Sequence, residues 1–380
     1  MATAVSEPVT VSRAAGFAAQ RLASLDIFRG MTLASMVLVN NPGSDQVYTP
    51  LEHAPWNGWT FTDTVFPFFL WMVGVAMTLS TAKRVERGES RRDLFLHAVG
   101  RAAIIFGVGL FLNAFPYFHL STLRIPGVLQ RIAVCYLIAA AIFLLVGVRG
   151  IVISIVLLLS SYWLLMMYAP VPGYGAGHLD QDVNFAKYVD SMVLTGHMWR
   201  HTKTWDPEGL VSTLPAIATA LFGVLMGYLL RSKRSPAEKA AWMAVMGNCL
   251  LGLGIVMDHF LPINKNLWTS SYAVFMAGLA SVVFMICYWV VDVQGWRRWL
   301  RPFSIYGMNA IAVFIATGIV GRLLGIIKIG DKSLGSWIFE GMFAPIASPL
   351  NASLLYAVAN VLFFYGIVYV MYKRGWFLRF

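Results

Sequence analysis

Ten apolar runs, each long enough to cross a lipid bilayer, constrain the fold of this chain more than any other feature of its sequence. A helix of roughly 20 apolar residues spans the ~30 Å hydrocarbon core of a membrane. The runs cover residues 24–41, 60–81, 98–116, 127–147, 151–169, 210–230, 240–260, 268–291, 303–324 and 352–372. We therefore predict an all-α, polytopic transmembrane helical bundle.

One further apolar segment, residues 336–349, is too short to span a membrane and contains two prolines. Irregular backbone at membrane depth is tolerated where protein surrounds it or where it faces water. A re-entrant or interfacial piece is the expected structure. The sequence leaves the total at about ten or eleven spans.

The overall composition agrees with a membrane protein. Of the 380 residues, 58% are hydrophobic and only 12% are charged, whereas soluble domains carry about 25% charged residues. The three cysteines all lie inside apolar runs without metal-type spacing, so we expect buried packing residues. The net charge of +11 comes from short basic clusters between the runs. No nucleic-acid motif accompanies them, so no nucleic-acid partner is expected.

The basic clusters predict the orientation. Most of the 29 Lys and Arg residues fall in the alternate loops that share a side with both termini, and such loops are cytoplasmic. Residues 1–20 lack the apolar core of a cleavable signal peptide, so we predict a disordered cytoplasmic tail. No repeat of 20–50 residues is visible, and residues 21–380 are predicted to form a single transmembrane domain.

Polar residues within the first apolar run are candidates for function because polar groups at membrane depth are unfavourable. Asp26 and Arg29 are three residues apart, so they share one helix face and can form an ion pair. Asn40 ends the same run at the opposite membrane face. Either it caps the helix or it has a chemical role.

A second cluster lies directly before the second run. It contains His53, Trp56, Asn57 and Asp63. Histidine as a residue type exchanges a proton near neutral pH, although a loop histidine is often inert. Trp56 fits equally well in the aromatic belt at a membrane interface.

A third cluster opens the fourth run with Gln130 and Arg131. Arg131 lies too deep to reach water easily, so we expect it to face an internal polar cavity. Either an anionic ligand or a structural partner such as Asp258 would satisfy it.

A fourth group precedes two later runs on the predicted extracytoplasmic side. Asp206 and Glu208 are candidates for capping the next helix or for binding substrate. Asn264, Lys265 and Asn266 carry polar groups that suit a ligand.

Two patterns that resemble metal sites are incomplete. The segment His197–His201 lacks the glutamate of the HExxH motif. In the stretch from Asp180, a calcium loop would require glycine where Phe185 stands. No metal is predicted.

Taken in order, several unusual stretches carry a resemblance to a known family. They are SLDIFRG, VNNPG, HAPWNGWTFTDTVFPFF, IPGVLQR, WDPEGLVSTLPAIATALFGVLMG, PINKNLWTSSY and YGMNA. From about residue 21 onward the chain resembles the catalytic membrane domain of the heparan-alpha-glucosaminide N-acetyltransferase family and its bacterial relatives. It shows no large amino-terminal domain outside the membrane, which favours a protein of the bacterial inner membrane and a bacterial envelope sugar as acceptor.

The resemblance implies transfer of an acetyl group from cytoplasmic acetyl-CoA to an amino-sugar amine or a sugar hydroxyl at the periplasmic face. The active histidine of the family matches His53 and its catalytic asparagine matches Asn40. His53 would act as a general base or as an acetyl carrier. Asn40 would donate a hydrogen bond to the developing oxyanion, and Asp63 would orient the imidazole or cap its helix.

Two sets of binding residues complete the expectation. The residues expected to hold acetyl-CoA are Arg29, Gln130, Arg131, Lys265 and Asn266. Those expected to bind the acceptor are Trp56, Asn57, Asp206, Glu208 and Asn264.

The choice between N- and O-acetylation stays open, and a homodimer is possible. The alternative function is a sugar or amphipathic-solute transporter, since many spans with intramembrane polar residues also suit a permease.

Overall fold

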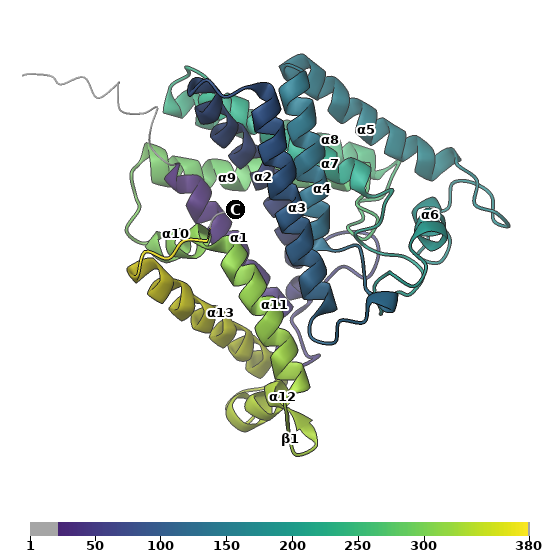
Figure 1. Ribbon diagram of the computed structural model, residues 1–380, viewed down its shortest axis with the longest axis vertical. Helices are drawn as coiled ribbons and strands as arrows, with labels where there is room; N and C mark the ends of the chain where they lie inside the picture. Colours follow the sequence, from purple (N-terminus) through teal and green to yellow (C-terminus); the bar gives the residue numbers. More distant parts are fainter. Residues whose placement is uncertain (1–21, 379–380) are drawn as a thin grey trace, which may run out of the picture.

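The computed structural model describes residues 22–378, and helices dominate this part of the chain (Figure 1). The predicted tail, residues 1–20, lies outside the described residues. The helices are α1 (Ala23–Asn40), α2 (Phe61–Glu86), α3 (Arg91–Ala114), α4 (Val128–Leu145), α5 (Val148–Tyr168), α6 (Phe185–Val193), α7 (Thr213–Arg231), α8 (Pro236–Asp258), α9 (Ser270–Tyr288), α10 (Arg301–Met308), α11 (Ala310–Ile326), α12 (Leu334–Ile338) and α13 (Pro349–Lys373). The strands β1 (Lys328–Ile329) and β2 (Lys332–Ser333) form a small antiparallel hairpin. The all-α prediction is confirmed.

Within the described residues, eight helices are long and apolar enough to cross a membrane, and a bent pair makes a possible ninth. The eight are α2, α3, α4, α5, α7, α8, α9 with its continuation to Val293, and α13. The protein is therefore a multi-pass membrane protein, as the apolar runs predicted.

Two of the ten predicted runs take a different form. The run at 303–324 is divided into α10 and α11, which meet at an angle of 78° around Asn309. The run at 24–41 forms α1, which is not among the helices of spanning hydropathy because polar residues such as Asp26 and Arg29 interrupt it. The segment at 336–349 gives only α12 and one π-helical turn, too short to cross.

Backbone contact between α2 and α7 forms the centre of the bundle. A Cβ atom on Gly74 would lie 1.9 Å from the Ala220 carbonyl oxygen, and one on Gly223 would lie 1.9 Å from that of Trp71. Only glycine permits this approach, which small residues favour in membrane helix pairs. The fully buried Trp71 side chain fills the space beside the contact.

The two ends of the described chain lie at the same end of the molecule. Asn309, beside α10, accepts a hydrogen bond from the Leu378 amide and donates one to the Trp376 carbonyl oxygen. The start of α1 packs on α10 as well, since a Cβ on Gly307 would lie 2.0 Å from the Asp26 carbonyl oxygen. This arrangement agrees with termini on one side, and the cytoplasmic assignment of that side stays a prediction.

The cysteine prediction holds for two residues of three. Cys135 and Cys287 are buried, whereas Cys249 is exposed on α8 and was wrongly expected to be buried. An apolar run does not reveal which helix face points to protein and which to lipid, and this explains the error.

Candidate active site

A cavity of about 550 Å³ extends along α1 between α2, α3, α4, α10 and α11. Arg29 and Asn40 both line it. They are eleven residues apart on one helix, a rise of about 16 Å. We call the two ends of this cavity the Arg29 end and the His53 end, after residues that line them.

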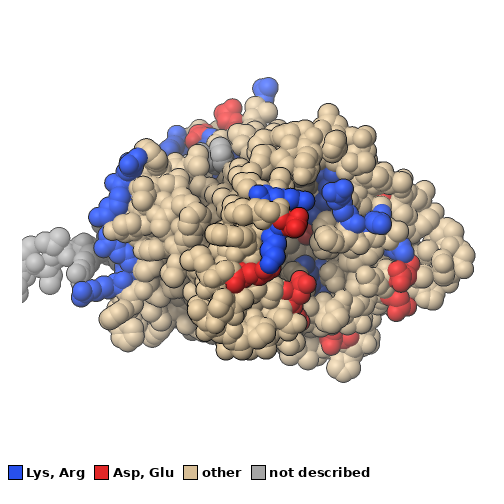
Figure 2. Space-filling model, turned by 90° about the horizontal axis from the view of Figure 1, so that it is seen from below, with Lys and Arg blue, Asp and Glu red and all other residues tan. Residues whose placement is uncertain are grey.

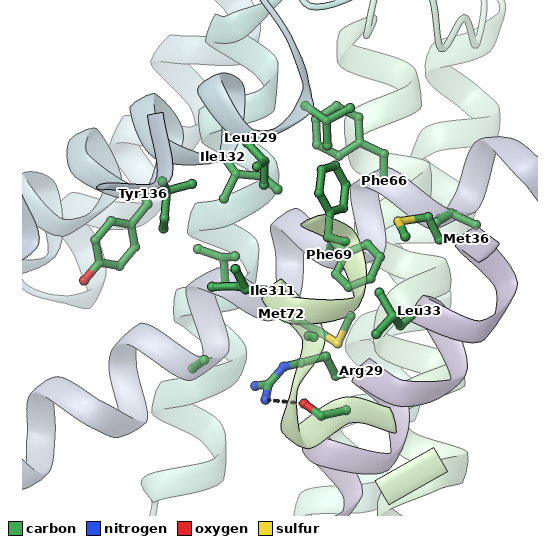
Figure 3. Close-up of a pocket in the computed structure, with 18 of the residues that line it drawn as sticks. Arg29, Leu33, Met36, Phe66, Phe69, Met72, Leu129, Ile132, Tyr136 and Ile311 are labelled. Carbon is green, nitrogen blue, oxygen red and sulfur yellow. Dashed lines mark hydrogen bonds between the residues drawn. The ribbon is translucent and has the colours of Figure 1, made fainter. Parts of the chain in front are cut away.

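Two arginines line the Arg29 end. The Arg29 Nη1 atom donates to Asp26 Oδ1 at 3.2 Å. It also donates to the Gly307 carbonyl oxygen at 3.5 Å (Figure 3). The predicted Asp26–Arg29 ion pair is therefore confirmed.

The second arginine, Arg101 of α3, was not identified as a site residue from the sequence. Its guanidinium lies 5.3 Å from the ring centroid of Tyr136, which also lines the cavity. Its buried Nε has no hydrogen-bond partner, and it forms no ion pair within residues 22–378. A partly buried cation of this kind, lining a cavity without a carboxylate beside it, favours an anionic ligand.

Apolar side chains form the middle of the cavity. Leu33, Phe66, Phe69, Met72 and Ile132 face the space beyond Arg29 in Figure 3. An apolar section between polar ends is suited to a flexible, uncharged chain with polar groups at its two ends.

Polar groups return at the His53 end. Asn40, His53, Glu208 and Lys265 all line the cavity, although they come from four separate segments of the sequence. Figure 2, which views the molecule from below, shows acidic and basic side chains gathered in the middle of this face.

His53 and Asp63 form a hydrogen-bonded pair. The His53 Nδ1 atom lies 2.6 Å from Asp63 Oδ1. A carboxylate at this distance favours the tautomer that carries the proton on Nδ1, which leaves the Nε2 lone pair available. The carboxylate is 1% exposed and the imidazole is 53% exposed. A buried carboxylate that orients an accessible imidazole is the arrangement of a general base.

Several contacts fix the position of Asp63. Its Oδ2 accepts hydrogen bonds from the backbone amides of Ala54 at 3.0 Å and Thr60 at 3.1 Å. Its own carbonyl oxygen accepts one from the buried Tyr272 hydroxyl at 2.6 Å. Thr60 and Asp63 also form a capping box at the start of α2. The two roles considered for Asp63, cap and partner of His53, coexist.

Known proteins with similar sequences indicate the family of the chain. Residues 21–263 match the family model described as "Heparan-alpha-glucosaminide N-acetyltransferase, catalytic". This match covers more than half of the chain. The chain belongs to this family.

Two mammalian members of the heparan-alpha-glucosaminide N-acetyltransferase family are similar to the chain over most of its length. The human heparan-alpha-glucosaminide N-acetyltransferase is 32% identical over 351 residues, which cover 78% of this chain and 52% of the human protein. The mouse protein is 32% identical over 353 residues, which cover 78% of this chain and 53% of the mouse protein. The chain thus spans about half the length of these relatives.

The structure brings together part of the site expected of a family member. Five expected residues line the cavity, Asp63 lies behind His53, and Gln130 lines a neighbouring cavity. Six lie elsewhere, namely Trp56, Asn57, Arg131, Asp206, Asn264 and Asn266.

Arg131 lines neither this cavity nor the neighbouring one, contrary to the expectation. Its side chain is buried, donates from Nη2 to the Gly209 carbonyl oxygen at 3.0 Å and lies 5.2 Å from the centroid of the Trp268 ring. The suggested partner Asp258 instead accepts a hydrogen bond from the Ile263 amide at 2.6 Å. Arg131 therefore joins α4 to the loop and the residue that precede α7.

Asp206 does not cap α7, since Ser212 occupies that position. Its buried carboxylate forms a paired contact with Arg124, at 2.8 Å from Nε and 2.6 Å from Nη2. Glu208 also binds Arg124. Burial opposes the charge of Arg124, but the two carboxylates outweigh this effect and raise the pKa of Arg124 above its usual range. The sequence signal for this contact was weak: Arg124 lies in one predicted extracytoplasmic loop, and Asp206 and Glu208 lie in another.

Asp190 of α6, also absent from the expected set, holds the loop that carries Glu208. Its Oδ1 accepts a hydrogen bond from the Leu210 amide at 2.9 Å, and a Cβ on Gly209 would lie 2.0 Å from Oδ2. Burial raises the pKa of Asp190 to about 6. Its position 16 residues before Asp206 gave no sequence signal.

The remaining expected residues connect loops. Asn264 donates to Asn57 Oδ1 at 3.1 Å, and the neighbouring Gly58 amide donates to the Ile263 carbonyl oxygen at 2.7 Å. These bonds attach the loop of His53 to the loop of Lys265. Trp56 donates to the Leu179 carbonyl oxygen at 3.0 Å.

Asn266 is partly exposed and lines neither cavity. In the part of the chain that the structure describes, no three His, Cys, Asp or Glu side chains form a group suited to a metal ion.

Proposed function

We propose that this protein is a membrane-embedded acetyltransferase that moves acetyl from acetyl-CoA to an amino-sugar amine or a sugar hydroxyl. The observation that carries the proposal is a single cavity with two arginines at one end and the His53–Asp63 pair at the other. Membership of the acetyltransferase family supports the same reaction.

Acetyl-CoA enters this proposal as the donor, with its phosphates at the Arg29 end. Arg29 and Arg101 supply planar guanidinium groups, which suit phosphate oxygens. The apolar middle of the cavity suits the extended arm that connects the phosphates to the thioester. This placement leads the thioester toward Asn40 and His53.

His53 performs the proton chemistry. With Nδ1 bonded to Asp63, the His53 Nε2 atom accepts a proton from the acceptor amine or hydroxyl as that group attacks the acetyl carbon. The new bond joins the acceptor to the acetyl carbon, the carbon–sulfur bond breaks, and the thiolate of CoA takes up the proton. The Asn40 amide lines the same end and would stabilise the oxyanion.

A two-step route uses the same residues. In that route Nε2 of His53 attacks the acetyl carbon, and the carbon–sulfur bond breaks to release the CoA thiolate. The acceptor then attacks the acetyl carbon, the bond to Nε2 breaks, and the proton of the acceptor passes to the thiolate. The His53 side chain is 53% exposed, enough for both the thioester and the acceptor to reach it.

The acceptor class and the cellular site also belong to the proposal. The relatives are named for a glucosaminide, so we propose a glucosamine-type acceptor at the His53 end. The bacterial inner membrane, the cytoplasmic position of the Arg29 end and a homodimer stay predictions of the sequence.

The direct test uses purified protein in detergent with acetyl-CoA and glucosamine. We expect release of free CoA together with N-acetylglucosamine, and loss of both with His53→Ala. His178→Ala is the matched control, because His178 is partly exposed, binds the Tyr174 carbonyl oxygen and lines neither cavity. Equal CoA release by His53→Ala and the wild type would refute the role of His53. Uptake of unmodified glucosamine by proteoliposomes without CoA release would favour a permease.

A further inference from the structure

A second cavity of about 360 Å³ adjoins the first. It is enclosed by the last turns of α1 and α3, the start of α4 and the second half of α11. Met36, Asn40, Val128, Leu129 and Phe314 line both cavities. A molecule beside Asn40 therefore has access to both spaces.

The second cavity contains an arginine without a carboxylate partner. Arg322 of α11 is partly buried, and its Nη1 donates to the Gly318 carbonyl oxygen of its own helix at 2.8 Å. Across residues 22–378 it forms no ion pair. Charged residues within transmembrane segments are normally paired or functional.

The other arginine of this cavity, Arg124, shows the contrast. Asp206 and Glu208 both bind it, so its charge is already balanced within the protein. Arg322 is left as the cation available to a ligand on this side of Asn40.

Gln130 adds an unpaired hydrogen-bond donor to the same wall. The residue is 4% exposed and its Nε2 atom is buried without a partner. Its Oε1 is packed against two glycines, since a Cβ on Gly109 would lie 2.4 Å from this oxygen and one on Gly127 would lie 2.7 Å from it. Buried polar groups without partners are rare in folded proteins and call for a ligand or an ordered water.

We infer that the second cavity is an acceptor subsite for an anionic oxygen group, a carboxylate or a sulfate, bound by Arg322 and Gln130. The inference rests on the proposed function and narrows its acceptor. The acceptor carries its reacting amine or hydroxyl at the His53 end, and it carries the anionic group on the same sugar or on the adjacent one. Charge-assisted bonds of this kind are among the stronger hydrogen bonds in proteins.

The test compares acceptors that differ in charge but share the reacting amine. Glucosamine, which has no anionic substituent, is the reference. Muramic acid carries a carboxylate and glucosamine 6-sulfate carries a sulfate. We expect wild-type kcat/KM to favour at least one anionic acceptor by about 10- to 100-fold over glucosamine. Arg322→Gln should remove most of that preference, and Gln130→Met should reduce it.

The matched control is Lys328→Gln. Lys328 is an exposed cation six residues after Arg322 and lines neither cavity, so its loss should leave the preference intact. Arg322→Lys keeps the charge and should retain part of the preference, and it guards against a folding defect in Arg322→Gln. The inference is overturned if the wild type shows no preference, or if Arg322→Gln lowers kcat/KM for all acceptors equally.

Ligand binding without acetyl-CoA separates this inference from the proposed function. We expect N-acetylmuramic acid or N-acetylglucosamine 6-sulfate to raise the thermal unfolding temperature of the wild type more than that of Arg322→Gln. If this difference in unfolding temperature is found but no acceptor is acetylated, the subsite is supported and the proposed acetyl transfer is refuted. If Arg322→Gln instead changes only the response to anionic lipid vesicles, Arg322 binds a lipid headgroup and the inference fails.

Discussion

The Nδ1 atom of His53 lies 2.6 Å from Oδ1 of Asp63, so the loop before α2 is joined to the first turn of that helix. The same carboxylate caps α2 through Thr60. The orientation of the imidazole is thus fixed by the start of a membrane helix. A substitution at Asp63 should therefore affect both the rate of acetyl transfer and the stability of α2.

Asp63→Asn should lower kcat by about 10²- to 10⁴-fold, because an amide no longer selects the tautomer with its proton on Nδ1. Thr60→Ala serves as the control, since it removes the capping hydroxyl and keeps the carboxylate that contacts His53. We expect Thr60→Ala to lower stability by about 1 kcal/mol and kcat only slightly. Equal kcat losses in both variants would mean that Asp63 acts only as a cap. Initial rates and thermal unfolding of each purified variant measure the two effects.

Arg101→Gln should raise KM for acetyl-CoA about tenfold, because it removes a cation from the Arg29 end. It is a cleaner test than a change at Arg29, whose loss would leave the Asp26 carboxylate without this partner. Arg149→Gln is the control, since Arg149 is exposed and lines neither cavity. An unchanged KM in Arg101→Gln would place the phosphates elsewhere.

Gly223→Ala and Gly252→Ala should have opposite effects on stability. The new methyl group at position 223 would lie 1.9 Å from the Trp71 carbonyl oxygen, so α2 and α7 must separate, at about 1–3 kcal/mol. At position 252 nothing lies within 4 Å, and alanine should stabilise the helix by up to about 1 kcal/mol. Thermal unfolding in one detergent compares the two, and equal unfolding temperatures would contradict the close approach of α2 and α7.

Asp190 should make stability depend on pH. Its pKa is raised by burial from 3.8 to about 6, so between these two pH values the folded protein holds a proton that the unfolded chain has lost. The contribution of Asp190 to the free energy of unfolding is therefore greatest below about pH 4. It falls by about 3 kcal/mol as the pH rises from about 4 to about 6.

Asp190→Asn removes the titration and keeps one acceptor oxygen for the Leu210 amide. Between pH 5 and pH 7 the unfolding temperature of the wild type should fall relative to that of Asp190→Asn. A difference that stays constant over this range would show that Asp190 does not titrate there.

Apolar run length was sufficient to predict the helical membrane fold, because each span is a local property of about 20 residues. It could not predict the break at Asn309, since the 78° bend between α10 and α11 lies inside a continuous apolar run. Nor could it predict that Cys249 faces outward.

The candidate site was predictable where the residues lie close together in sequence. His53 and Asp63 are ten residues apart, and the structure brings them together as expected. The contact of Arg124 with Asp206 spans 82 residues, and it shows why Asp206 was misjudged as a cap. Arg101 and Arg322 were missed because both appeared in the sequence as ordinary charges near span ends.

Sidedness in proteoliposomes tests the central claim most directly. Acetyl-CoA is sealed inside vesicles that contain the protein, and glucosamine is supplied only outside. Protease added outside cleaves the loops exposed there, and the cleavage pattern reports the orientation of the protein. We expect N-acetylglucosamine to appear outside while CoA stays inside, and no product with His53→Ala. Product that forms only when both substrates share one compartment would contradict a cavity that delivers the acetyl group across the membrane.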